Sequence, residues 1–273
     1  PSSAASDVYK RQACPGPGSP QTTRSTRSPR PGRWLLVARV LTPRRIADLM
    51  TDRIRAYFCS LGHEPAEAED LHTHYYKEYG LAIRGLVKHH EIDALDYDAK
   101  CDASLPLESI LHPDKEAIAL FEQLSPEKCR VYALTNAYKH VRCISRVHAD
   151  RQHAQRVLRL LGLDRLVEAV VYCDYVNPGF ACKPERVFYD AAMAAIQAPQ
   201  GAPVYFVDDS AKNVHAAQEL GWKSCGTCRR RLATLTAVLF DEKAVGTPRR
   251  SADGLMTIAR LAQLRELWPE LFT

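Results

Sequence analysis

Two adjacent carboxylates, Asp208 and Asp209, follow an apolar run at residues 204–207 that is typical of a short buried strand. In an open parallel α/β sheet the carboxyl ends of the strands face the ligand crevice, so this pair should lie at a binding site. Two such carboxylates repel each other unless a cation lies between them, and a hard, oxygen-liganded ion such as Mg²⁺ meets that requirement. The structural alternative is that Asp209 or Ser210 caps the helix that is predicted from Ala211.

Two further segments supply a hydroxyl, an amide and an ammonium group. Thr135 and Asn136 follow the apolar run 129–134, and Lys183 precedes a predicted helix; all are expected at strand ends. Thr135 and backbone N–H groups can bind phosphoryl oxygens, while Lys183 offsets developing negative charge. Taken alone, Lys183 is typical of a solvated residue at the start of a helix, and Thr135 and Asn136 are typical of a capping pair. The ordered set favours phosphoryl chemistry, with Thr135 and Lys183 as catalytic residues and Asn136 as a further phosphate ligand.

Alternating strand and helix patterns from residue 105 onward predict the element that positions these groups. Strand-like apolar runs at 129–134, 170–172 and 204–207 are separated by helical patterns, and a final helical pattern covers 258–267. This alternation implies βαβ units and a parallel sheet that is covered on both faces. The fold class is therefore α/β.

An all-helical block, residues 42–104, precedes the alternating pattern. Helical periodicity follows Thr42 and the proline after it, restarts at Glu64 or Pro65, and continues over residues 81–90. Such a block is predicted to be a small separate cap.

The core is assigned to residues 34–41 and 105–273. The apolar run 34–40 predicts either a strand or the lead-in to a helix. Residues 1–33 are rich in Pro, Ser, Arg and Gly, so they are predicted to be a disordered leader. The first twelve residues also resemble translated adapter sequence and are not expected to be part of the fold.

Length and charge argue against several classes of protein. The 273 residues suffice for one large domain or for one domain with a cap. The net charge of +5 arises within residues 1–33, and the remainder has 31 basic and 31 acidic residues, so a nucleic-acid polymer is not an expected partner. The chain lacks an apolar run of about 18 residues, so no membrane span is predicted.

The nine cysteines show no disulfide framework spacing. Together with the lack of a visible secretory signal, this favours a reducing cytoplasmic or nuclear setting. Cys225 and Cys228 form the only C-x-x-C pair, which is half of a zinc site. A redox or zinc protein is therefore a weak alternative.

Three motifs, in this order, resemble those of the haloacid dehalogenase superfamily. ALTNA at 133–137, CKPE at 182–185 and VYFVDDSAKN at 204–213 are similar to the second, third and fourth motifs of that superfamily. HYYKEYGLAIRGLVKHH at 74–90 and YCDY at 172–175 are similar to its fungal pyrimidine 5′-nucleotidase branch. The resemblance extends from the helical block to the fourth motif.

This resemblance implies a Rossmann-like three-layer core with a parallel sheet and a small all-helical cap inserted after the first strand. It also implies Mg²⁺-dependent hydrolysis of nucleoside 5′-monophosphates through an aspartyl-phosphate intermediate. Carried over, Thr135 and Asn136 bind phosphate and Lys183 orders the nucleophile and the phosphate. Asp208 ligates the metal, and Asp209 contacts the ion directly or through another ligand.

Four cap residues, Tyr76, Lys77, Tyr79 and Arg84, lie where the family meets its nucleotide. An aromatic ring there can stack on a base, and a cation can bind sugar or phosphate. The structural alternatives are that Tyr75 and Tyr79, four residues apart, belong to the packed interior of the cap, and that exposed basic residues are simply solvated. The expected partner is a small nucleotide or another phosphomonoester, and the sequence does not indicate an oligomeric state.

The first motif of the family, a strand followed by Asp-x-Asp, is missing. Its position corresponds to residues 30–46, RPGRWLLVARVLTPRRI, which contain no aspartate. In the family the first Asp is the nucleophile and the second is the acid/base. The nearest aspartates, Asp7 and Asp48, do not follow a strand, so the chain has no identifiable nucleophile.

A second departure is the segment Val141–Gln152, which separates the second motif from the helical pattern that should follow it. This suspected insertion is consistent with a retained in-frame intron, and the two departures together suggest an incorrectly predicted gene. Two functions therefore stay open: a phosphohydrolase that has lost its first motif, and a catalytically inactive relative that binds phosphate or a nucleotide. Dehalogenase activity is weaker, because it needs the missing aspartate too.

Overall fold

The computed structural model describes residues 32–38, 44–124, 129–138, 153–177, 179–220, 237–241, 243–244, 246–250 and 254–272. The suspected insertion and the Cys225–Cys228 pair lie outside the described residues. So does the predicted leader, except for Gly32 and Arg33.

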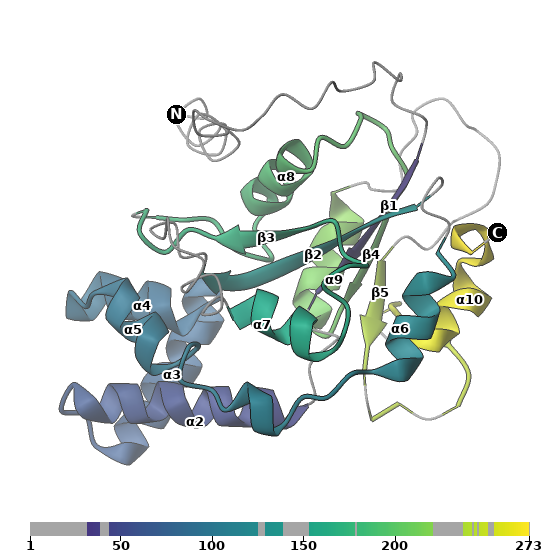
Figure 1. The fold of residues 1–273 in the computed structure, drawn as a ribbon. Helices are drawn as coiled ribbons and strands as arrows, with labels where there is room; N and C mark the ends of the chain where they lie inside the picture. The colour runs from purple at the N-terminus through teal and green to yellow at the C-terminus, as the bar shows by residue number, and fades with distance from the viewer. Residues whose placement is uncertain are drawn as a thin grey trace, which may run out of the picture.

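A mainly parallel sheet forms the centre of the core (Figure 1). In the described chain it has seven strands in the order β3-β2-β1-β4-β5-β7-β6, and β6 alone runs antiparallel to its neighbour. The prediction of a parallel α/β sheet is confirmed. The strands are β1 (Arg33–Val37), β2 (Cys129–Tyr138), β3 (Ala169–Cys173), β4 (Val204–Asp208), β5 (Ala237–Phe240), β6 (Arg249–Arg250) and β7 (Met256–Ile258).

Strand β1 lies in the middle of this sheet, between β2 and β4. Its last residue, Val37, pairs with Ala133 of β2 and with Val207 of β4. Leu35, Leu36 and Val37 are fully buried, as expected for a strand that is covered on both faces. Of the two structures that the apolar run 34–40 allowed, the strand is therefore the one formed.

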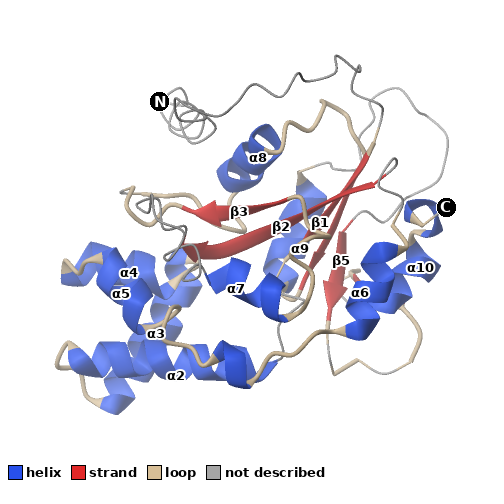
Figure 2. Cartoon of the chain, viewed as in Figure 1, coloured by secondary structure: helices blue, strands red, loops and turns tan. Residues whose placement is uncertain are grey.

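Helices pack on both faces of the sheet, which makes the core three layers deep (Figure 2). α8 (Arg186–Ala195) and α9 (Ala211–Glu219) share one apolar cluster with the sheet. α6 (Lys115–Glu122), α7 (His153–Leu160) and α10 (Leu264–Leu267) share the cluster on the opposite face. None of the helices in the described part of the chain has the length and apolar character needed to cross a membrane.

The block predicted to be helical is a group of helices between β1 and β2. This group lies beside the carboxyl ends of β2 and β3, which the arrowheads mark in Figure 1. Gly85 is in the middle of one of these helices because a Cβ atom there would lie 2.2 Å from Cγ of Tyr75 on the neighbouring helix. The assignment of this cap as a separate domain stays a prediction. The cap helices are α2 (Arg44–Ser60), α3 (Pro65–Tyr79), α4 (Ala82–His90) and α5 (Ala94–Lys100).

The predicted helix over residues 258–267 is wrong in its first half. Ile258 ends β7, where it pairs with Phe240 of β5. A 3-10 helix, Leu261–Gln263, then leads into α10. The side-chain oxygen of Gln263 accepts hydrogen bonds from the backbone N–H groups of the two residues before that turn, at 2.8 and 3.1 Å. Apolar residues three apart fit this strand and turn as well as a helix, so the spacing could not separate the two.

Histidines and tyrosines form a hydrogen-bonded cluster at the end of the cap. The Tyr75 hydroxyl lies 2.9 Å from Nε2 of His90, whose Nδ1 lies 3.4 Å from Nε2 of His63. The Tyr79 hydroxyl lies 2.8 Å from Nε2 of His89. Burial lowers the pKa of His90, and the charges of His63 and His89 lower it further.

This lowered pKa predicts that the cap is sensitive to acid. The folded state favours neutral His90, so its contribution to stability is present above the ordinary histidine pKa and is lost as the pH falls through the lower folded pKa. We expect the melting temperature to fall more between about pH 7 and pH 5 for the wild type than for His90→Gln, which cannot take up a proton. Thermal melts followed by circular dichroism measure this. The exposed His112→Gln is the control and should behave as the wild type; equal losses in all three proteins would contradict the prediction.

Candidate active site

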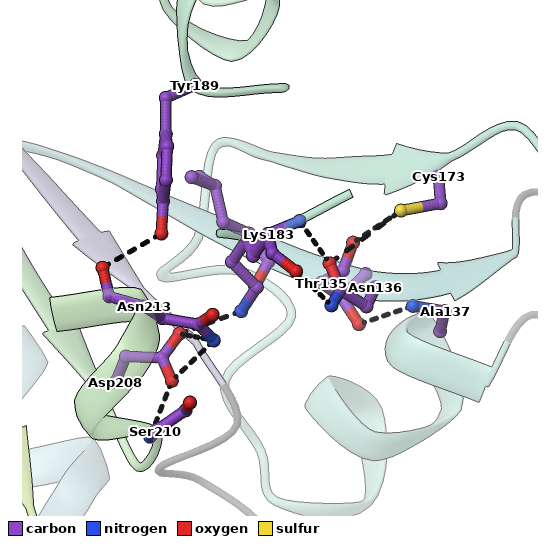
Figure 3. Close-up of polar contacts among 10 residues, drawn as sticks. Thr135, Asn136, Ala137, Cys173, Lys183, Tyr189, Asp208, Ser210 and Asn213 are labelled. Atoms are coloured by element: carbon purple, nitrogen blue, oxygen red, sulfur yellow. Dashed lines mark hydrogen bonds and ion pairs between the residues drawn. The ribbon is translucent and has the colours of Figure 1, made fainter. Parts of the chain in front are cut away.

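One buried lysine joins two of the strand ends (Figure 3). Nζ of Lys183 donates to the carbonyl oxygen of Leu134 at 3.1 Å and to Oδ2 of Asp208 at 2.8 Å. The lysine side chain is 4% exposed and the aspartate side chain is fully buried. Because Leu134 directly precedes Thr135, the three predicted segments meet at one edge of the sheet, as expected from the strand-end rule.

Lys183 itself does not lie at a strand end, so that expectation is wrong. β3 ends at Cys173, and the lysine lies in the following loop, shortly before α8. The loop is held to the sheet edge by the Asn136 amide, which accepts from the Lys183 backbone N–H at 2.9 Å and donates to its carbonyl oxygen at 3.2 Å. The Tyr175 hydroxyl also donates to the Asn136 carbonyl oxygen, at 2.7 Å. Asn136 therefore contacts the backbone of the lysine, in addition to lining the cavity described below.

The Asp208 carboxylate is surrounded by protein donors. Its Oδ1 accepts from the Ser210 N–H at 2.8 Å, Nδ2 of Asn213 donates to both oxygens at 3.0 and 3.1 Å, and Lys183 donates to Oδ2. Ser210 is the N-cap of α9 but its side chain makes no capping bond. Asp209 is exposed and lines the cavity.

The side chains around Asp208 offer a magnesium ion fewer free ligands than it usually has. Mg²⁺ requires near-octahedral oxygen ligands, usually one or two carboxylates with waters and substrate phosphate. Asp208 already accepts from three donor groups, one of them an ammonium, which leaves Asp209 as the member of the pair that faces the cavity. Within the described residues no group of three or more His, Cys, Asp or Glu side chains could hold a metal. The assignment of Asp208 and Asp209 as Mg²⁺ ligands stays a prediction.

A cavity of about 700 Å³ lies between the cap and the strand ends. This volume falls in the usual range for small-molecule sites. Asp208, which is fully buried, is the one predicted site residue that does not line the cavity. The predicted residues that line it are Tyr76, Lys77, Tyr79, Arg84, Thr135, Asn136, Lys183 and Asp209.

The cap residues differ in how much of each side chain is engaged within the protein. Tyr76 is 48% exposed, and Nζ of Lys212 on α9 lies 5.9 Å from its ring centroid, so this contact joins cap and core. Lys77 is exposed. The Tyr79 hydroxyl is bonded inside the cap. Arg84 is held by an ion pair, with its Nη1 2.5 Å from Oε1 of Glu185.

The structure shows which residue follows the central strand, where the family resemblance implies the nucleophile. Ala38 directly follows β1, whose register places it level with Leu134 and Asp208. Its backbone N–H donates to the carbonyl oxygen of Val207 at 2.9 Å, and it is buried at the cavity wall. An alanine therefore stands at the end of the central strand, where the family resemblance implies the aspartate of the first motif.

Two thiols near the lysine do not replace that aspartate. Burial raises the pKa of Cys182 to about 11 and raises the pKa of Cys173 well above its ordinary value. Thiols are nucleophiles in their thiolate form. Both cysteines are therefore protonated near neutral pH and unsuited to attack phosphorus.

Sequence reasoning missed three side chains that shape the site: Asn213, Lys212 and Glu185. For Asn213 a signal was present, because its position in the first turn of α9 allows its amide to reach back to Asp208. The contacts of Lys212 with Tyr76 and of Glu185 with Arg84 carried no local signal, since these partners lie far away in the sequence.

The model of the haloacid dehalogenase-like hydrolase family matches residues 41–221, which include the cap, the lysine loop and β4. The chain belongs to this family of hydrolases. The match begins three residues after Ala38, beyond the place of the first motif.

A curated relative of this hydrolase is "Phosphate metabolism protein 8" of Saccharomyces cerevisiae, which is 34% identical over 182 residues. The alignment covers 63% of the chain and 53% of the yeast protein, so the chain spans about half the length of this relative. Among solved structures, a HAD-superfamily hydrolase of subfamily IA, variant 1, from Geobacter sulfurreducens matches 70% of the chain and 84% of its own chain. That match has 13% identity and a TM-score of 0.35.

Proposed function

We propose that the cavity binds the phosphate group of a nucleoside 5′-monophosphate, or of a phosphomonoester of similar size. We further propose that the architecture is that of a phosphohydrolase. The observation that carries this proposal is the buried Lys183 ammonium at the edge of the sheet, beside Thr135 and beneath a cavity roofed by the cap. The name of the yeast relative, "Phosphate metabolism protein 8", supports phosphate chemistry.

Each residue of the proposed site has a distinct task. Lys183 supplies positive charge at the strand ends. The Thr135 oxygen accepts from the Ala137 N–H at 3.1 Å, which leaves the hydroxyl proton for a phosphoryl oxygen. Tyr76 presents a half-exposed ring on which a base can stack, and Lys77 adds a cation at the same wall.

Hydrolysis through a covalent intermediate requires one more group. A carboxylate must lie in line with phosphorus, at about 3–3.5 Å, before it can attack. Ala38 has no such group, and Asp208 is held by Lys183, Ser210 and Asn213. We infer that the printed sequence binds its ligand without turnover, and that hydrolysis belongs to a chain with the complete first motif.

Binding of UMP and of inorganic phosphate to the unaltered protein tests this proposal by isothermal titration calorimetry. We expect both to bind, UMP more tightly, because its base and sugar occupy the cavity. Thr135→Ala should weaken the binding of both ligands by about ten- to a hundredfold, because the loss of one hydrogen bond to a charged group costs about 1.5–3 kcal/mol. Ser109→Ala, which changes an exposed residue of a 3-10 helix, is the control. Failure of UMP to bind at millimolar concentration, or unchanged affinity in Thr135→Ala, would refute the proposed site.

A further inference from the structure

The segment that carries Lys183 is held from the core on one side and from the cap on the other. On the core side, the Asn136 amide bonds both backbone groups of the lysine. On the cap side, Oε2 of Glu185 accepts from the Cys182 N–H at 3.0 Å, while Oε1 pairs with Nη1 of Arg84 at 2.5 Å. The same carboxylate thus contacts the residue that precedes the lysine and a guanidinium on cap helix α4.

Arg84 is fixed in the cap by contacts of its own. Its Nη1 also donates to the carbonyl oxygen of Tyr79 at 3.0 Å, and its guanidinium carbon lies 5.8 Å from the ring centroid of Phe180 in the lysine loop. Burial lowers the pKa of Arg84, but the hydrogen bond to Glu185 and the nearby charges raise it more, so the net shift is upward. The ion pair is therefore favoured in the docked position of the cap.

We propose that Glu185 is a positioning residue for Lys183, and that its pair with Arg84 couples the docking of the cap to the placement of this lysine. When the cap moves away, Glu185 loses its charged partner and the turn at Cys182 loses a support, so the lysine is less firmly held. The proposal rests on the proposed function only in taking Lys183 as the residue that supplies positive charge for the phosphate group. The position of the lysine can be measured without any ligand or turnover.

A second ion pair in the same chain provides a matched control. Nη2 of Arg130 lies 2.5 Å from Oε2 of Glu168. The side chains of this pair are 44% and 41% exposed, and those of Arg84 and Glu185 are 24% and 38% exposed. This control pair joins β2 to the segment just before β3 and does not involve the lysine loop. A general effect of losing one ion pair should appear equally in both.

The experiment measures how fast Lys183 reacts with dilute acetic anhydride in the unliganded full chain, by peptide mass spectrometry. Lys115, exposed on α6, is the internal reference. Because the buried lysine reacts through local opening, we expect its relative rate to rise about tenfold in Glu185→Ala and also in Arg84→Met. Glu168→Ala should leave the rate unchanged.

Two outcomes would overturn the proposal. If Arg84→Met leaves the Lys183 rate unchanged while Glu185→Ala raises it, the cap is not coupled to the lysine. If Glu168→Ala raises the rate as much as Glu185→Ala, the effect is one of overall stability. Glu185→Gln separates the two contacts of this side chain: its oxygen can still accept from the Cys182 N–H, but the charge that pairs with Arg84 is lost. A Lys183 rate as high in Glu185→Gln as in Glu185→Ala would support the coupling through Arg84. A failure of UMP to bind would leave these rates unaffected, so the two proposals fail separately.

Discussion

Replacing Ala38 and Val40 with aspartate should enable the chain, which we expect to be inactive on nucleotides, to release phosphate from UMP and CMP. Ala38 follows the central strand at the cavity wall, level with Leu134 and Asp208, so a carboxylate there would lie at the edge that carries Lys183. The second substitution completes the Asp-x-Asp spacing and supplies the acid/base group that the family resemblance implies. We expect phosphate release at least about a hundredfold above that of the parent chain, since a positioned acid/base group alone contributes about 10²–10⁴.

The controls for this experiment isolate the carboxylate. Ala38→Asn with Val40→Asp keeps the size and polarity of the side chain but removes the nucleophile, so it should be inactive. Asp208→Asn in the doubly substituted chain should abolish the gained activity, because it weakens the hold on Lys183. Each assay is run with and without Mg²⁺, which the family resemblance implies for the complete motif. Robust turnover by the parent chain would show that another group is the nucleophile.

Lys183→Met should strongly destabilise the protein. It removes the ammonium from a fully buried carboxylate, and breaking one side of a buried ion pair typically costs about 3–5 kcal/mol. The bonds from Ser210 and Asn213 still support Asp208, which places the expected loss near the lower end of that range. The free energy of unfolding from urea denaturation measures this loss.

Two further variants test the cause of that destabilisation. Adding Asp208→Asn to Lys183→Met removes the unpaired buried carboxylate charge and should recover part of the lost free energy of unfolding. Lys100→Met breaks a surface ion pair, in which the side chain of Lys100 is 57% exposed and that of Asp96 is 43% exposed. This substitution should lower the free energy of unfolding by less than about 1 kcal/mol. Equal losses for Lys183→Met and Lys100→Met would show that the buried pair does not stabilise the fold.

Local patterns in the sequence determined the class of the fold. Short apolar runs at 129–134, 170–172 and 204–207 became parallel strands, and the helical spacing of residues 42–104 became the cap helices. The strand-end rule brought Thr135 to the cavity, but its expected place after the strand is wrong, because β2 continues past it to Tyr138. The strands and helices depend on residues close together in the chain, so periodicity and turn chemistry could predict them.

The tertiary structure alone decided which side chains share a partner at the site. Asp208 is engaged by Lys183 while Asp209 lines the cavity, and Arg84 forms an ion pair with Glu185 of the core. Only the register of β1 identified Ala38 as the residue at the central strand end. Such pairings join segments far apart in the chain, and burial and competing donors select them only after the sheet and cap have packed.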